Sequence, residues 1–430
     1  MTPSWWHYGA QVTSDKGRLQ RVLRLRGDLR HLLGANVVSQ TGDWMLGVGL
    51  AFAVYDLTGS TLASAGTLLA AFLPQVLAGP VAGVFVDRWD RRRTMVAANV
   101  VMACVVLPLV LVTDAATVWV VFPVLVVQSL VEVFFAPAEQ AMLPRLVPDD
   151  ELVTANALNG QAGQVARLVG SALGGVAAAV GGVPAVALLD AASFLLAALL
   201  LSRIRTPGRV VTPAGEPDAA AVVSRRTHAF LTDLRTGVSV VRRSRALVVL
   251  LVFSVVTALG EGVMGVLFAP YVRDVLGADG GVYGSIMAMQ AVGGLAGGAV
   301  AVVLAHRWGQ VRTLGVTSVL FGLVDLVIFL YPLVLDAVWP ALAGMLVVGL
   351  PAAFLSAAFL TLFQRSTRDE TRGRAYSLVA LARTCAVIVG STTAGLLGER
   401  LGIMPVLAYQ GVAYVLAGLV VLVALRESDA

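Results

Sequence analysis

Seven ionisable side chains stand inside apolar stretches of this sequence, where they could bind and release protons or pair with a charged ligand. Placing such a group in hydrocarbon costs roughly 3 kcal/mol on insertion scales, so each is a candidate for a functional role. A carboxylate that loses hydration holds its proton more tightly, and a nearby guanidinium opposes that effect. The pattern favours reversible proton binding within a membrane. The residues are Asp43, Glu132, Arg167, Asp190, Glu261, Asp325 and Arg383, with Glu139 near the end of a stretch.

The elements that carry these residues are predicted to be transmembrane helices. Of the 430 residues 58% are hydrophobic and 13% are charged, whereas a soluble domain has about 25% charged residues. The sequence therefore indicates an all-α integral membrane protein. Twelve stretches are long enough to cross about 30 Å of hydrocarbon: 32–55, 63–86, 94–112, 118–141, 157–180, 183–202, 246–270, 282–305, 313–332, 337–362, 376–397 and 404–425.

The distribution of basic residues predicts the orientation. With the N-terminus in the cytoplasm, only Arg273 and Arg400 fall in outer loops, as the positive-inside rule requires. The net charge of +5 therefore needs no nucleic acid to explain it. We expect a multi-pass protein of a bacterial plasma membrane with both termini in the cytoplasm.

An internal repeat divides the chain into two halves. The segment "GPVAGVFVDRWDRRRT" (79–94) is similar to "GAVAVVLAHRWGQVRT" (298–313), and further similar segments lie at offsets of 218 to 220 residues. Two parallel six-helix halves are the signature of one transporter architecture, with the substrate site at their interface. The expected parts are a basic tail (1–31), two six-helix halves (32–202 and 246–425), a linker with an amphipathic helix between them (203–245) and a short tail (426–430).

Two segments carry a resemblance to a known family. The loop Gly83-x-x-x-Asp87-Arg88-x-x-Arg91-Arg92 is similar to the signature loop of the major facilitator superfamily. The segment "FFAPAEQAMLPRLVPDDELVTANALNG" (134–160) resembles the branch of siderophore (enterobactin-type) exporters and macrolide efflux pumps. This resemblance implies a monomer that moves a small molecule by alternating access, with helices 1, 4, 7 and 10 around the cavity.

The sequence departs from the family pattern at several positions. Asp90 stands where the signature loop usually has glycine, and the second copy of the loop has His306 in place of the acid, so we expect only the first copy to gate. The helix 5 motif reads Gly170-Ser171-x-x-Gly174-Gly175 without its usual proline, which weakens the inference of export. Its three glycines are predicted to pack helices closely.

The signature loop has two interpretations. A basic turn that obeys the positive-inside rule explains the arginines but not Asp87. The resemblance instead implies a cytoplasmic gate, in which Asp87 at the end of helix 2 holds the start of helix 11, near residues 374–378. Gly83 would allow the close approach, and Arg88, Arg91 and Arg92 would complete the gate.

Three of the intramembrane charges share one depth. From the cytoplasmic helix ends, Asp43 lies about 17 Å deep, Arg167 about 15 Å and Glu132 about 14 Å. The resemblance implies that they meet beside the cavity, with Glu261, the repeat equivalent of Asp43, facing them from the other half. The alternative is a static ion pair that only fixes helix packing. Asp190 has Gln410 as its repeat equivalent, and we expect it to have a structural role, in which a hydrogen bond between helices satisfies it without any part in transport. Asp325 receives no role.

Other classes of protein fit less well. The only lysine, Lys16, lies outside any Walker pattern, so ATP does not drive this chain directly. The sequence lacks the Gly-x-Gly-Asp of intramembrane aspartyl proteases, and its four histidines have no metal-ligand spacing. We expect no enzyme, metal or cofactor, and a twelve-helix repeat exceeds what a passive channel or scramblase needs. The predicted function is proton-coupled export of lipophilic small molecules; the alternatives are a substrate-specific exporter, for instance of a siderophore or natural product, or an importer.

Overall fold

The computed structural model describes residues 27–86, 89–208, 232, 234–304 and 309–426. Within these ranges the chain is helical and contains no strand. The first half consists of α2 (Gly27–Thr58), α3 (Thr61–Val86), α4 (Arg91–Val106), α5 (Val121–Leu146) and α6 (Leu152–Ser202). The second consists of α8 (Arg245–Pro270), α9 (Gly280–Leu304), α10 (Gln310–Leu330), α11 (Trp339–Arg365), α12 (Asp369–Leu401) and α13 (Ile403–Ala424).

Eleven helices of the described chain are long and apolar enough to cross a membrane, and one of them contains two spans. Helix α6 has 51 residues, a length of about 76 Å at 1.5 Å per residue, which is more than twice the hydrocarbon thickness. Gly182 interrupts it with a φ of 61° that only glycine adopts without strain. The chain reverses there, so the described residues supply the twelve spans that the sequence predicts.

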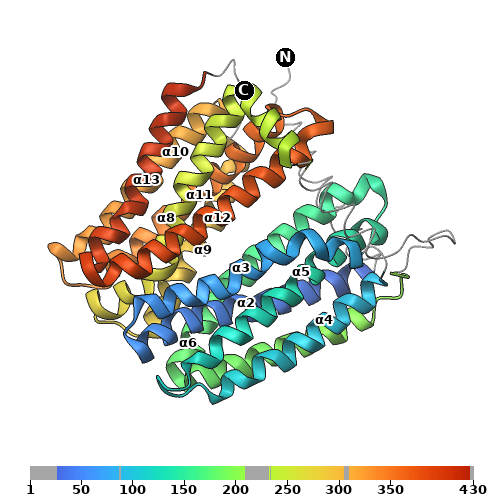
Figure 1. Ribbon diagram of the computed structural model, residues 1–430, viewed down its shortest axis with the longest axis horizontal. Helices are drawn as coiled ribbons and strands as arrows, with labels where there is room; N and C mark the ends of the chain where they lie inside the picture. The colour runs from blue at the N-terminus through green and yellow to red at the C-terminus, as the bar shows by residue number, and fades with distance from the viewer. Residues whose placement is uncertain (1–26, 87–88, 209–231, 233, 305–308, 427–430) are drawn as a thin grey trace, which may run out of the picture.

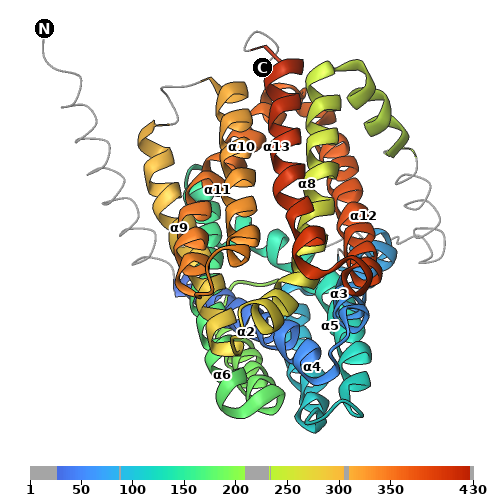
Figure 2. The same ribbon diagram turned by 90° about the vertical axis from the view of Figure 1, so that its left-hand side faces the viewer.

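The helices form two bundles, α2 to α6 and α8 to α13, which meet on the left of Figure 1 and separate toward the right. In the first bundle α2 packs along α6, and the buried core runs from Leu29 to Ile204. In the second, α8 packs against α12 and α13, while α10 packs on α13. Figure 2 shows the second bundle above the first.

Part of the predicted linker helix is present. Residues 234–243 are helical and end just before α8. Val241 is buried in the core of the second bundle. A Cβ on Gly237 would come within 2.7 Å of the Arg374 carbonyl oxygen. The linker helix therefore lies against the start of α12.

Candidate transport site

The two bundles are joined at the end of the molecule that the sequence predicts to face outward. There α6 packs against α9 and α3 against α12. The backbones of Gly175 and Gly284 are so close that a Cβ on Gly284 would lie 2.6 Å from the Gly175 Cα. On the other flank, the Thr61 hydroxyl donates to the Gly395 carbonyl at 2.8 Å. These contacts hold the outer end closed.

Two crossed contacts add to this closure. Tyr55 donates a hydrogen bond to Asp274, and Arg273 forms an ion pair with Asp56. Residues 55 and 56 correspond to 273 and 274 at the repeat offset of 218. Equivalent dipeptides therefore bind each other across the pseudo-symmetry axis. We call these four residues the outer latch.

Two acids inside the spans of the first half, Asp43 and Glu139, have polar but uncharged partners. Asp43 accepts a hydrogen bond from Gln128 at 3.3 Å. Glu139 accepts from Asn36 at 2.6 Å and from Asn159 at 2.9 Å. Glu132 lies within electrostatic range of Asp43 and Glu139. The first half thus gathers three acidic side chains, of which the sequence predicts Asp43 and Glu132 to share one level.

Arg167 lies differently from the expectation that it sits between Asp43 and Glu132. Its guanidinium stacks over the Trp44 ring, 5.0 Å from the ring centroid, and donates to Gln290 of α9 at 2.5 Å. Among the described residues it forms no ion pair with either acid. The reason is packing: Gly170, one turn further along α6, touches the backbone of α2, so the long side chain turns along Trp44 toward the other half. Arg167 is also within electrostatic range of Glu261.

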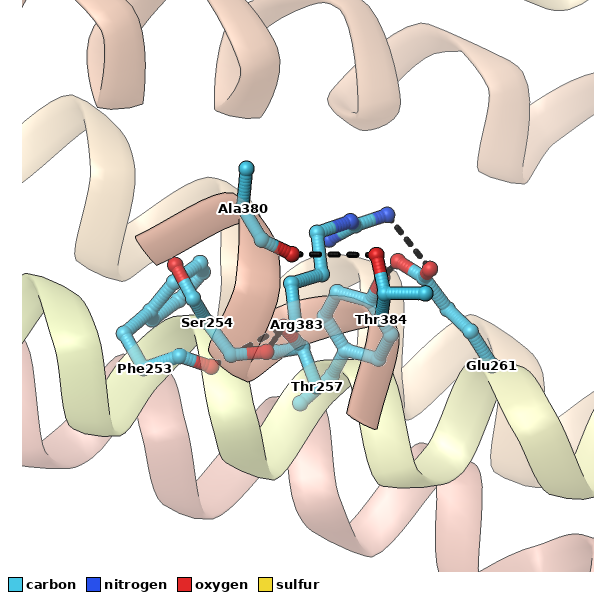
Figure 3. A network of polar contacts seen from close by, with 8 residues as sticks. Phe253, Ser254, Thr257, Glu261, Ala380, Arg383 and Thr384 are labelled. Carbon is cyan, nitrogen blue, oxygen red and sulfur yellow. Dashed lines mark hydrogen bonds and ion pairs between the residues drawn. The ribbon is translucent and has the colours of Figure 1, made fainter. Parts of the chain in front are cut away.

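The second half contains an ion pair that the sequence did not predict. Arg383 of α12 donates to Glu261 of α8 at 2.5 Å, and the Tyr414 hydroxyl donates to the same carboxylate at 2.8 Å. Figure 3 shows the Arg383 and Glu261 side chains pointing toward each other. The side chains are 47% and 31% exposed, respectively, so the pair is not enclosed by the described protein. Its signal in the sequence was only that both residues are charged and lie within spans.

A buried polar side chain packs against a glycine at equivalent positions of the two halves. A Cβ on Gly42 would overlap the Asp190 carboxylate, and one on Gly260, the equivalent of Gly42, would lie 3.0 Å from Gln410. Asp190 and Gln410 are equivalents too, at offset 220. In each half a glycine therefore lets the helix that carries Asp43 or Glu261 approach a buried polar side chain. Asp190 is fully buried, and its Oδ2 has no hydrogen-bond partner within the ranges that the structure describes.

The predicted cytoplasmic gate is described only in part. Asp87 and Arg88 lie outside the described residues, and Gly83 lies in the last turn of α3. Arg91 donates to the Ala141 carbonyl at 2.9 Å, and Arg92 donates to the Ser202 carbonyl. Both bonds stay within the first half. Asp90, which replaces the usual glycine, caps α4 by accepting from the Arg93 amide at 2.9 Å.

The helix 5 glycines divide between two interfaces. Gly174 faces α2, where an added Cβ would lie 2.5 Å from the Met45 carbonyl oxygen, and Gly170 faces the same helix. Gly175 faces α9, where the Cβ would lie 2.7 Å from the Gly280 carbonyl oxygen. Gly170 and Gly174 thus fix the packing inside the first half, while Gly175 belongs to the closure between halves.

We expect Gly174→Val to destabilise the first half, because the new side chain meets backbone that cannot rotate away. Overpacking of this kind costs about 1–3 kcal/mol. Thermal unfolding in detergent measures the effect, with Gly160→Val as the control because no atom lies within 4 Å of its added Cβ. Equal melting temperatures for the two variants would contradict this packing role.

The sequence and fold are similar to those of known transporters. The family model described as "Transmembrane secretion effector" (MFS_3) matches residues 25–430. Macrolide efflux protein A of Streptococcus pyogenes is 25% identical over 370 residues, 85% of this chain and 88% of that relative. The MFS-type transporter YfiS of Bacillus subtilis is 24% identical over 417 residues, 95% of each chain. The crystal structure of a bacterial homologue of the iron transporter ferroportin superposes with a TM-score of 0.70 at 17% identity, covering 92% of this chain and 98% of that one.

The twelve spans and these similarities define a multi-pass membrane transporter that acts on a small molecule, and not an enzyme. The chain belongs to the transmembrane secretion effector family of major facilitator transporters and resembles macrolide efflux pumps.

Proposed function

We propose that this protein is a proton-coupled exporter of lipophilic small molecules in a bacterial plasma membrane, acting as a monomer with both termini in the cytoplasm. The observation that carries the proposal is the Arg383–Glu261 pair, a partly exposed charge pair inside the membrane-spanning part of the chain. Arg167 lies within electrostatic range of it from the other half. Such a pair can open when Glu261 takes a proton or when a charged cargo replaces Arg383. The names of the efflux relatives support export.

The closed outer end supports an inward-facing state, in which the cavity is open to the cytoplasm. In this state cargo enters from the cytoplasm or inner leaflet. After cargo is released on the outside, a proton that binds to the outward-facing state would drive the return to the inward-facing state. This coupling requires that the affinities for proton and cargo differ between the two states. Asp43 and Glu132 in the first half and Glu261 in the second are the proposed proton-binding groups, with Arg167 and Arg383 as their cationic neighbours.

Transport into everted membrane vesicles with an imposed pH gradient tests this function. The panel consists of a macrolide, a lipophilic cation and a ferric siderophore. We expect the macrolide and the cation to accumulate and a protonophore to abolish accumulation. Siderophore accumulation alone would favour the substrate-specific exporter. Accumulation only in right-side-out vesicles would favour an importer, and a requirement for ATP would overturn the class of mechanism.

The proposed cytoplasmic gate forms in the outward-facing state. Asp87→Asn should weaken that state, because a neutral side chain loses its attraction to the positive start of helix 11. We therefore expect faster labelling of cysteines introduced in the cytoplasmic cavity. Asp149→Asn, an exposed acid in another predicted cytoplasmic loop, is the control. Unchanged labelling in a well-expressed Asp87→Asn variant would argue for a plain basic turn.

A further inference from the structure

Asp325 on α10 is a buried acid that the transport mechanism above does not use. Asp325 is 1% exposed. Its carboxylate accepts a hydrogen bond from the side-chain amide of Gln410 on α13 at 2.7 Å. Among the described residues no basic side chain bonds to it. An unpaired carboxylate in such surroundings is far less stable than the neutral acid. The surroundings of Asp325 therefore favour a bound proton.

The partner residue supports the same protonation state. The Gln410 side-chain oxygen is buried, and the described part of the chain supplies no hydrogen-bond donor to it. A buried acceptor without a donor costs about 1–3 kcal/mol. A proton on Asp325 supplies a donor beside it, so that the acid and the amide can satisfy each other.

The buried acid and the exposed ion pair each have a hydrogen-bond partner on the same face of α13. Gln410 and Tyr414 are four residues apart, so they lie on the same face, about 6 Å apart along the axis. Gln410 bonds Asp325 and Tyr414 bonds Glu261. The Phe321 ring lies 4.3 Å from the Tyr414 ring, and Tyr414 is 6% exposed, so this region is shielded from water.

We propose that Asp325 is a proton-storage site of the second half that exchanges its proton with Glu261 along the Gln410–Tyr414 face of α13. This proposal rests on the proton coupling proposed above. In the exchange, the Tyr414 hydroxyl gives its proton to Glu261 and takes up the proton that Asp325 releases, so that an O–H bond breaks at Asp325, one forms at Glu261 and the tyrosine is restored, while the negative charge ends at Asp325. Glu261 is free to accept the proton when Arg383 leaves it.

Several charged or titratable groups surround this unit and set its proton affinity. Arg383 and Tyr376 of α12 and Arg167 of α6 act on the Glu261 end. Tyr414 of α13 interacts with both acids. Among the described residues the positive groups stand at the Glu261 end, whereas the groups that act on Asp325 are the uncharged Gln410 amide and Tyr414. This arrangement favours a proton on Asp325, away from the guanidinium of Arg383.

Infrared spectroscopy of the purified protein in lipid bilayers tests the storage site without transport. Neutral carboxyl groups absorb separately from carboxylates. We expect the difference spectrum between wild type and Asp325→Asn at neutral pH to show loss of a protonated-carboxyl band. The asparagine is nearly isosteric and can still bond Gln410. An unchanged protonated-carboxyl region would overturn the proposal.

Deuterium exchange of that band tests the connection to Glu261. Tyr414→Phe removes the hydroxyl that bonds Glu261, so exchange at Asp325 should slow. Tyr409→Phe, an exposed tyrosine on the same helix, should leave exchange unchanged. Equal exchange rates in the two variants would overturn the route through Tyr414.

Transport separates this proposal from the broader one. If wild-type transport ignores the pH gradient, proton coupling fails, whatever the infrared result. If wild-type transport is coupled, Asp325→Asn should shift its pH dependence. A coupled wild type with an unshifted Asp325→Asn variant would overturn the storage role alone.

Discussion

Asp43→Asn and Glu132→Gln are each expected to abolish gradient-driven accumulation of cargo while leaving the protein folded. Both isosteres keep the shape of the side chain and can still form hydrogen bonds, as Asp43 does with Gln128. Neither can exchange a proton. Accumulation in energised vesicles should fall to the level of vesicles without a gradient, whereas binding of cargo in detergent should persist.

The controls for this prediction lie in the same half of the protein, on α5 and α4. Gln128→Glu adds an acid beside Asp43 and should change the pH dependence without abolishing transport. Asn99→Asp adds an acid to α4 at a fully buried position outside the proposed site, so it should reduce stability without a specific effect on coupling. Wild-type transport with an unaltered pH dependence in both isosteres would make the cluster structural and move the coupling to Glu261 or Asp325.

Reversal of one charge in the outer latch is expected to shift the protein toward its outward-facing state. The Arg273 and Asp56 side chains are 50% and 40% exposed, so the pair itself contributes only about 0–1 kcal/mol. Asp56→Arg replaces that attraction by repulsion between two arginines. A change of about 1.4 kcal/mol alters a two-state equilibrium tenfold, which is enough to populate the open outer end. Asp56→Arg combined with Arg273→Asp should restore closure.

Distances between spin labels at Thr113 and Asp336, two exposed positions in outer loops of the two halves, measure this shift. The exposed native cysteines, Cys104 and Cys385, must first be replaced. Asp114→Arg reverses an outer-loop acid whose carboxylate accepts hydrogen bonds from the nearby Thr117, and it should leave the distances unchanged. If the distances lengthen in Asp56→Arg and stay long when Arg273→Asp is added, then loss of the ion pair is not the cause of the opening.

The sequence predicted the parts of the fold that repeat. Hydrophobic length located the spans, and the offset of 218 to 220 residues marked Glu261 as the equivalent of Asp43. The crossed pairing of Tyr55 and Asp56 with Arg273 and Asp274 follows the same offset, although charge type alone did not reveal it. The repeat therefore predicts the position of a residue in the fold well, because equivalent helices pack in the same way in both halves.

The side-chain partners that break the repeat could not be predicted. Arg383 pairs with Glu261, yet the position equivalent to Arg383 in the first half is Gly163, so symmetry offered no guide. Arg167 was expected beside Asp43, but its conformation is set by Trp44 and the contact with α9. The pairing of Asp325 with Gln410 depends on the close approach of Gly322 and Gly411, which no spacing along the chain encodes.

The most direct test of the central claim is whether cargo movement drives protons in the opposite direction. The purified protein is reconstituted into liposomes that contain a pH-sensitive dye and no ATP, and a macrolide gradient is imposed without a pH gradient. Coupled exchange predicts that macrolide flowing down its gradient moves protons the other way, and that Asp43→Asn removes the pH change. Macrolide flux without any pH change, or with the same pH change in Asp43→Asn and in protein-free liposomes, would contradict the account.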